Sequence, residues 1–148
     1  MCFIKRILLK DFLEGESKEI TKILEEDLIV YKMVVKHTKL FPFLFKNTYF
    51  APFNSYEYKK KKVSTSPLRI NFYYKKDTHI DIIVTNGFHS FRTLKDLKKN
   101  ILWSSIYEVA KFIIPKGSTV IINDTQVVSD KIMFYKEINP YNDKRRSC

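Results

Sequence analysis

Glycine, cysteine and tryptophan are scarce in this sequence of 148 residues, which contains 3 Gly, 2 Cys and 1 Trp. Cys2 and Cys148 stand at its two ends, outside any Cys-x-x-Cys or Cys/His spacing. Their positions argue against a zinc site and against a disulfide scaffold, and they favour a reducing compartment. Because glycines are so few, each one is expected to mark a turn.

Long hydrophobic runs are also missing. The opening segment, MCFIKRILLKDFLEGE, contains Lys5, Arg6, Lys10 and Asp11 among its apolar residues. A signal peptide or a membrane-spanning helix needs an uninterrupted apolar stretch, so neither is expected here. We therefore predict a cytoplasmic protein with no membrane partner.

Acidic residues are too few to balance the basic ones. The sequence has 27 Lys and Arg against 16 Asp and Glu, which gives a formal net charge of +11. Such an excess produces a positive potential that attracts polyanions, whether nucleic acid, a nucleotide or an acidic protein face. A sequence rich in Lys, Ile, Asn, Tyr and Phe is also what an AT-rich genome encodes, so charge alone does not identify the partner.

Apolar residues are abundant enough to bury one core. Hydrophobic residues make up 45% of the sequence and aromatic residues 15%. No internal repeat or linker divides the chain, so we predict a single domain over 1–148. Within it we expect a helical N-terminal segment over 1–26 and a mobile polar tail over 140–148.

The stretch from Ile82 to Asp124 shows the clearest order of elements. A β-branched run ends at Asn86-Gly87, a dipeptide that favours a tight turn. Thr93 and Asp96 form an approximate capping box at the start of a helix. The elements predicted in and around this stretch are a strand over 80–84, a helix over 93–103, a strand over 106–114, a turn over 115–118 and a strand over 119–123.

The flanking segments add strands and short helices. Lys32 is the one polar residue in the run LIVYKMVV, which is typical of an interior strand. The predicted elements are short helices over 3–13 and after Ser17, a strand over 28–35, a hairpin of strands over 68–74 and 79–84, and a closing strand over 127–138 with a bulge at Ser129-Asp130.

These elements predict an α+β fold with a mainly antiparallel sheet, one principal helix and short N-terminal helices. The predicted core is Leu28, Val30, Val34, Ile70, Phe72, Ile82, Val84, Phe88, Phe91, Leu94, Leu97, Ile101, Val109, Phe112, Ile114, Ile121 and Ile132. Two segments are harder to place. The Phe-rich segment from Leu40 to Phe53 is either an aromatic loop over the core or an exposed surface for bases or a partner. The lysine run over 59–62 is typical of a solvated loop.

Four short blocks resemble small proteins of unassigned activity from bacteriophages and their bacterial hosts. The blocks are Met1-Cys2, the strand over 28–35, Gly87-Phe88-His89-Ser90-Phe91, and Ile113 to Ser118. The resemblance implies a phage-type accessory protein, a class that includes inhibitors and ligand sponges acting against host defence. It would place the protein in the host cell cytoplasm.

His89 is the most notable titratable residue. It follows a glycine turn and precedes a helix start, where Ser90, Arg92 and Thr93 could hold a phosphate on unpaired amide groups. The alternative is that His89 orients the turn through a hydrogen bond to the backbone. His37 and His79, at strand ends, are interpreted as structural or exposed.

No catalytic motif is complete. Adjacent Ser90 and His89 point to opposite sides of an extended segment, and no nucleophile elbow accompanies them. The run Pro115 to Ser118 lacks the first glycine of a phosphate-binding loop and lies between strands. The three histidines lack the patterned carboxylates of a metal site. An ADP-ribosyltransferase-like fold is compatible with these elements, but only Glu108 and Glu137 are candidate acids and neither stands in a motif.

We therefore expect a non-enzymatic accessory protein that binds an anionic partner. The partner is either a nucleotide-like small molecule or an acidic surface of a host defence protein. A nucleotide-acting enzyme of the ADP-ribosyltransferase-like type and a nucleic-acid-binding module remain as alternatives. No catalytic residue, metal or cofactor is predicted. The predicted ligand-binding residues are Arg69, Tyr73, Lys75, His89, Ser90, Arg92 and Lys116.

Overall fold

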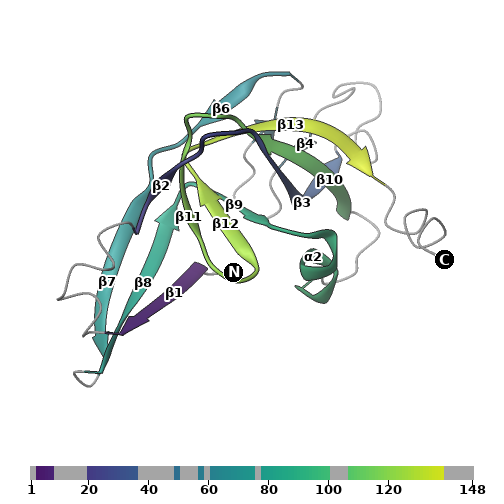
Figure 1. The fold of residues 1–148 in the computed structure, drawn as a ribbon. Coiled ribbons are helices and arrows are strands. Elements are labelled where there is room, and N and C mark those ends of the chain that lie inside the picture. The colour runs from purple at the N-terminus through teal and green to yellow at the C-terminus, as the bar shows by residue number, and fades with distance from the viewer. Residues whose placement is uncertain are drawn as a thin grey trace.

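The computed structural model describes residues 3–8, 20–36, 49–50, 57–58, 61–75, 78–100 and 107–138. These residues form two antiparallel sheets and the helix α2 (Leu94–Asn100) (Figure 1). The dominance of antiparallel strands with a helix on one side confirms the predicted class at this coarse level.

The larger sheet contains ten strands. They are β2 (Lys22–Ile23), β3 (Leu28–Lys36), β4 (Tyr49–Phe50), β5 (Glu57–Tyr58), β6 (Val63–Thr65), β9 (Phe88–Phe91), β10 (Tyr107–Ile114), β11 (Thr119–Ile122), β12 (Gln126–Ser129) and β13 (Lys131–Ile138). Its main path follows the order β2-β11-β12-β9-β3-β10-β13-β6, and β4 pairs with β3 and β5. The smaller sheet consists of β1 (Phe3–Leu8), β8 (His79–Asn86) and β7 (Arg69–Lys75), in that order.

Strand β3 lies inside the larger sheet, between β9 and β10. Val30 and Val34 are fully buried on one face, whereas Tyr31 and Met33 are partly buried on the other. A strand covered on both faces requires apolar residues at successive positions, which the run LIVYKMVV provides. The prediction of an interior strand is confirmed.

The main core fills the concave face of the larger sheet. Phe112 is central to it, with its ring centroid 4.8 Å from that of Tyr58 and 5.3 Å from that of Phe134. Strands that are distant in the sheet order contribute to this cluster, so the sheet must curve, and β10 and β13 arch over β9 and β12 (Figure 1). The cluster contains Leu24, Val30, Val34, Tyr58, Phe88, Ala110, Phe112, Ile114, Val120, Val127, Ile132 and Phe134.

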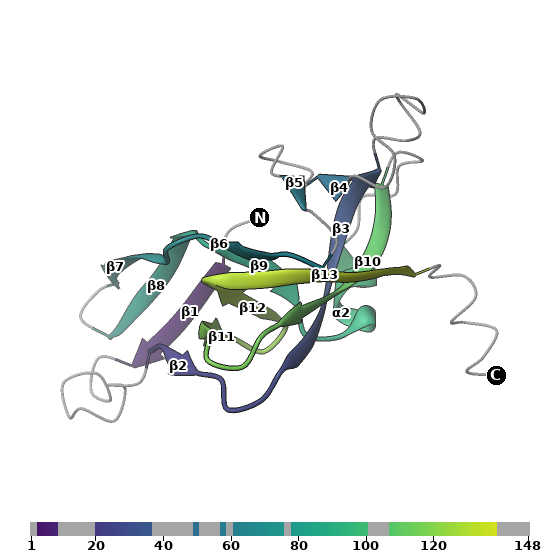
Figure 2. The same ribbon diagram turned by 90° about the horizontal axis from the view of Figure 1, so that it is seen from above.

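Two elements cover the convex face of the larger sheet. The smaller sheet packs on β11 and β12, where Phe3 and Val84 meet Ile121 and Val128. Helix α2 packs elsewhere, with fully buried Leu97 in one cluster with the side chains of β3, β9 and β10. The smaller sheet is therefore a separate layer that extends to one side of the molecule (Figure 2).

Gly87 marks a crossing between the two sheets. Its φ of +108° favours glycine, and a Cβ at this position would lie 2.6 Å from Leu68 Cδ2 and 2.9 Å from Val128 Cγ1. The preceding strand β8 belongs to the smaller sheet and the following strand β9 to the larger one. The Asn86-Gly87 dipeptide thus carries the chain from one layer to the other, where the sequence predicted a tight turn.

The predicted N-terminal helices are wrong for the described residues. Phe3–Leu8 forms β1 and pairs with β8 throughout, and residues 20–24 contain a bend and β2. In a run this short, helical and strand periodicities fit the same apolar residues, and pairing with β8 decides between them. The remaining positions of both helices, residues 9–19, lie outside the described residues, as does the predicted tail over 140–148.

The predicted closing strand over 127–138 is two strands. The chain turns at Asp130, whose Oδ1 accepts a hydrogen bond from the Thr119 amide at 2.9 Å. The Asp130 amide donates to the Thr119 carbonyl at 3.1 Å, and its carbonyl accepts from the Ser66 amide at 2.8 Å. These three bonds fix a corner, not a bulge, between β12 and β13.

Most of the predicted core is buried. Leu28, Ile70 and Leu94 are only partly buried, and Ile101 lies outside the described residues. The prediction that Phe72 is buried is wrong, since this residue lies on the outer strand β7 and is 45% exposed. The described part of α2 runs from Leu94 to Asn100, and the predicted helix end near Trp103 lies outside the described residues.

Candidate functional site: the three-stranded sheet

The smaller sheet carries a charged cluster on one face. Arg6 lies opposite Asp81 in the β1 and β8 register, and Tyr73 lies opposite Asp81 on β7. Arg6 Nε donates to Asp81 Oδ1 at 2.8 Å and Arg6 Nη2 to Asp81 Oδ2 at 3.3 Å, which makes a bidentate ion pair. The hydrogen bond and the charge of Asp81 together raise the pKa of Arg6 above its ordinary value.

His79 borders this cluster. Its Nε2 lies 3.9 Å from Asp81 Oδ1, while its Nδ1 is 2.9 Å from Thr78 Oγ1. The Nε2 atom is buried and has no hydrogen-bond partner among the described residues. The Asp81 side chain is 7% exposed and that of Arg6 is 61% exposed, so the cationic member of the pair faces solvent. The pair is neutral overall, and it presents an exposed guanidinium group that a buried carboxylate holds in place.

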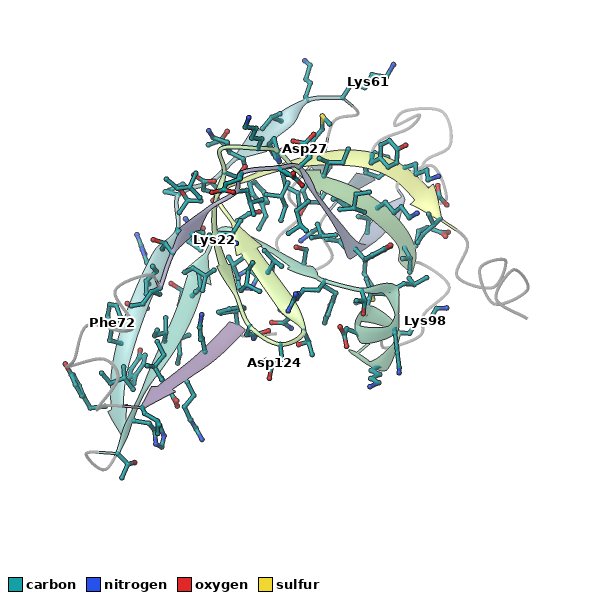
Figure 3. The ribbon with its side chains drawn as sticks, viewed as in Figure 1. Lys22, Asp27, Lys61, Phe72, Lys98 and Asp124 are labelled. Carbon is teal, nitrogen blue, oxygen red and sulfur yellow. The ribbon has the colours of Figure 1, made fainter. Side chains whose placement is uncertain are left out.

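Strand β7 forms the outer edge of the smaller sheet. Phe72, Tyr73 and Tyr74 are 45%, 50% and 68% exposed. Phe72 and Tyr74 lie on one face of the strand and Tyr73 on the other, because successive side chains alternate. Figure 3 shows Phe72 at the outer rim of the molecule. Large exposed aromatic side chains gathered on one strand are characteristic of interaction surfaces.

The structure places three of the predicted ligand-binding residues on β7. Arg69 begins the strand and is exposed, Tyr73 lies near its middle, and Lys75 ends it. The side chain of Lys75 lies outside what the structure describes. The predicted hairpin of β7 and β8 is confirmed by their antiparallel pairing.

His89 and Ser90 lie elsewhere, on β9 in the larger sheet. Ser90 is buried, and its Oγ donates to the carbonyl of Val127 at 3.2 Å. His89 is partly buried beside Val128. Burial lowers the pKa of His89 to about 4, and the nearby charge of Lys32 acts in the same direction. His89 is therefore neutral at physiological pH.

Arg92 fastens the start of α2 to the β11 and β12 turn. Its amide donates to the Thr125 carbonyl at 2.9 Å, and its Nη1 lies 3.4 Å from the Asn123 carbonyl. Thr93 and Asp96 form the predicted capping box, in which the Asp96 amide donates to Thr93 Oγ1 at 3.1 Å and that hydroxyl donates to Asp96 Oδ2 at 2.8 Å. The hydroxyl proposed as a phosphate ligand is thus engaged by a carboxylate.

Lys116 lies in the turn between β10 and β11. Its amide donates to Asp27 Oδ1 at 2.8 Å, whereas Arg92 contacts the turn at the other end of β11. Asp27 and Asp124, which are labelled in Figure 3, show how far apart these two ends lie. The seven predicted residues therefore occupy separate regions: Arg69, Tyr73 and Lys75 share β7, His89 and Ser90 share β9, and Arg92 and Lys116 lie apart from both groups.

Lys32 is a buried cation, and it is the single charged residue in the run LIVYKMVV. It extends from β3 into the concave core and is 9% exposed. Among the described residues, it donates a hydrogen bond to the His89 carbonyl and lies with its Nζ 5.8 Å from the centre of the Tyr58 ring. Burial lowers the pKa of Lys32 to about 7. With Ala110 as its cross-strand neighbour on β10, a long side chain fits at this position.

Sequence reasoning did not identify Arg6, Asp81 or Lys32 as important. Arg6 and Asp81 are separated by 75 residues in sequence, so no local pattern connects them. Strand alternation in FIKRIL was the available signal, because it places Arg6 on the face opposite Phe3. For Lys32, the signal was a single charge in a run otherwise apolar on both faces.

Metal and membrane features are not found in the described ranges. No group of three or more His, Cys, Asp or Glu residues there could hold a metal ion. No helix among those residues is long and apolar enough to cross a membrane. No family model matches the chain, and neither the curated proteins nor the solved structures contain a significant match. The resemblance to phage proteins therefore stays a prediction.

Proposed function

We propose that this protein is a non-enzymatic, phage-type accessory protein that counteracts a host defence by binding an acidic surface of a host protein. The binding surface is the edge of the smaller sheet formed by β7, with the Arg6 face beside it. The protein acts in the cytoplasm of the host cell. The observation that carries this proposal is the exposure of three consecutive aromatic residues, Phe72, Tyr73 and Tyr74, on an outer strand.

Charge supports an acidic partner. The chain has a net charge of +11, Arg69 is exposed at the start of β7, and the Arg6 side chain is exposed on the adjoining face. Such charges steer an acidic protein toward the surface and raise the association rate. The aromatic side chains then supply apolar contact area at low cost in side-chain entropy, as Tyr does at many interfaces.

A protein partner suits the geometry better than a small nucleotide. Aromatic side chains extend from both faces of an edge strand, so a partner must meet the strand from the side. A nucleotide stacks on one aromatic face and needs charged groups directed at its phosphate. Ser90 and Thr93, which could supply phosphate contacts, instead bond to Val127 and Asp96.

The test is native mass spectrometry of tagged protein purified from infected host cells. We expect a stoichiometric acidic protein to co-purify with the wild type. The double variant Tyr73→Ala/Tyr74→Ala should lose it, because it removes the exposed contact area. The matched control is Tyr135→Ala, since Tyr135 is 52% exposed on β13 in the larger sheet and should not matter. A retained nucleotide in place of a protein would contradict the proposal.

A further inference from the structure

The edge of β7 that faces away from β8 carries backbone groups without a sheet partner among the described residues. Its only neighbour there is β8, which pairs with it from Arg69 to Lys75. In an antiparallel pair, every second residue of an edge strand directs its amide and carbonyl groups outward. β7 therefore offers a template on which another extended segment can form a ladder.

Natural proteins usually block such edges. They use short edge strands, prolines, lysines or bulges, which prevent unwanted pairing. The register of β7 shifts between Arg69 and Ile70, and Pro67 precedes the strand. The stretch from Ile70 to Tyr74 contains none of these devices, and three of its side chains are exposed aromatic residues. By contrast, the outer strands of the larger sheet are short, since β2 has two residues and β6 has three.

The charge of the chain determines which kind of strand fits. A second copy would bring another net charge of +11 against the first, so pairing of two β7 edges is electrostatically unfavourable. A segment with glutamate or aspartate at alternate positions avoids this repulsion. Arg69 at one end of β7 and Lys75 at the other place basic residues at both ends of the ladder.

We propose that the partner binds by adding an acidic, extended segment as a further strand along the outer edge of β7. This inference rests on the proposed function and specifies its mode of recognition. Main-chain hydrogen bonds to β7 supply affinity, while Phe72 and Tyr74 on one face and Tyr73 on the other contact alternate side chains of the added strand. An exposed β strand thereby recognises an acidic sequence without an enclosed pocket.

The probe is a short synthetic peptide of alternating glutamate and valine, added to the full chain. Amide hydrogen exchange is followed by NMR with the peptide at about ten times its Kd. Amides on the outer edge of β7 should then exchange about tenfold more slowly, because only the unbound fraction exchanges. Protection should appear at every second residue of β7 and should not appear on β1. A peptide with N-methylated backbone amides should give no such protection.

Two variants separate strand addition from other contacts. Tyr74→Glu places a negative charge on the edge, where it repels the glutamate peptide, so it should abolish the protection, and the native fold should persist because Tyr74 is 68% exposed. Tyr135→Glu is the matched control and should leave protection unchanged. Three results with peptides would overturn the inference: equal binding of a lysine-valine peptide, protection on β1 instead of β7, and no protection at millimolar glutamate-valine peptide. A wild-type dimer in sedimentation that the double variant Tyr73→Ala/Tyr74→Ala dissociates would also overturn it.

The same exchange experiment on a purified complex distinguishes the two proposals. If a protein co-purifies in a manner that depends on Tyr73 and Tyr74 but β7 shows no alternating protection, the mode of binding is wrong and the proposed function stands. If the peptide gives alternating protection but no protein co-purifies from infected cells, strand addition stands and the proposed function is wrong.

Discussion

Replacing Lys32 by methionine should stabilise the protein near neutral pH and destabilise it at high pH. Methionine has a similar length and no charge, so it can occupy the core position beside Ala110 and Tyr58. The perturbation removes two things, the cost of burying an ammonium group and the hydrogen bond that this group donates to the His89 carbonyl. The balance between these effects changes with pH.

The magnitude follows from the pKa of Lys32, which burial lowers from 10.5 to about 7. Between these two values the unfolded lysine binds a proton and the folded lysine does not, so stability rises with pH by about 1.4 kcal/mol for each pH unit. Near pH 7 the buried charge thus costs about 4 kcal/mol. The lost hydrogen bond costs about 1–3 kcal/mol, because a buried carbonyl loses its donor. Lys32→Met should therefore gain about 1–3 kcal/mol near pH 7.

Above pH 10.5 the lysine is neutral in both states, and only the lost hydrogen bond remains. The variant should then be less stable than the wild type by about 1–3 kcal/mol. Urea unfolding at a series of pH values that starts at 7 and extends above 10.5 measures both differences. Lys111→Met is the matched control, because Lys111 lies on the neighbouring strand β10 with its Nζ 6.0 Å from the Tyr31 ring, on the other face of the sheet. It should retain the wild-type pH slope.

The reasoning is refuted if Lys32→Met is destabilising near pH 7 and keeps the wild-type pH slope. That outcome would mean that an anionic group compensates the charge of Lys32 in the folded protein. A change of sign between neutral and high pH, absent in Lys111→Met, is the expected result.

Three further predictions test other parts of the structure. Gly87→Ala should lower the free energy of unfolding by about 2–5 kcal/mol in urea, because the new Cβ would lie 2.6 Å from Leu68 at a positive φ. Gly117→Ala, with φ +87° and nothing within 4 Å of the Cβ, should lower it by only about 1–3 kcal/mol. Equal losses would contradict the packing argument. The pKa of His89 is lowered to about 4 from 6.5, so between these two pH values only the unfolded histidine binds a proton. The stability of the protein should therefore fall as pH falls from 6.5 to 4. His89→Gln should show a smaller fall in parallel thermal scans. Thr93→Ala should lose about 1 kcal/mol through the broken cap of α2, and Thr93→Ser should restore most of it; an unchanged stability in Thr93→Ala would mean that the cap contributes nothing.

Several elements could be predicted because their patterns are local. The run LIVYKMVV predicts an interior strand, Thr93 and Asp96 predict a capped helix start, and Pro115 to Ser118 predicts a turn. Each depends on residues within a few positions of one another, so periodicity and capping rules suffice. The β7 and β8 hairpin is predictable for the same reason, since the chain reverses within a few residues.

Other features depend on contacts between distant segments. The helical spacing in residues 3–8 fits an edge strand equally well, and only the pairing of β1 with β8 shows which is correct. Phe72 was predicted to be buried because it alternates with polar residues, but the sequence does not show how far the covering layer extends along β7. The corner at Asp130 depends on Thr119 and Ser66, which no pattern around Ser129 could indicate.

The candidate site was predictable only in part. Arg69, Tyr73 and Lys75 share β7 as strand periodicity implies, but nothing local indicated that β7 would form an outer edge. The proposed phosphate site depended on unpaired groups near Ser90 and Thr93. The Ser90 hydroxyl instead donates to the Val127 carbonyl, across a sheet, and the Thr93 hydroxyl donates to Asp96, in the cap. The sequence shows which side chains can bond, and the fold determines which bonds form.

The β7 and β8 hairpin is inserted in the sequence between two strands of the larger sheet. The chain leaves that sheet after β6 and returns at β9, and these two points are fastened together. Asn86 Nδ2 donates to the Pro67 carbonyl at 2.6 Å, and Ser66 Oγ donates to Asn86 Oδ1 at 3.3 Å. Because these bonds hold the two ends of the hairpin together, its sequence can vary without changing the distance between β6 and β9 in the larger sheet. Grafting a different sequence onto β7 (Arg69–Lys75) should therefore retarget the protein, while β8 keeps its packing and the larger sheet keeps its core.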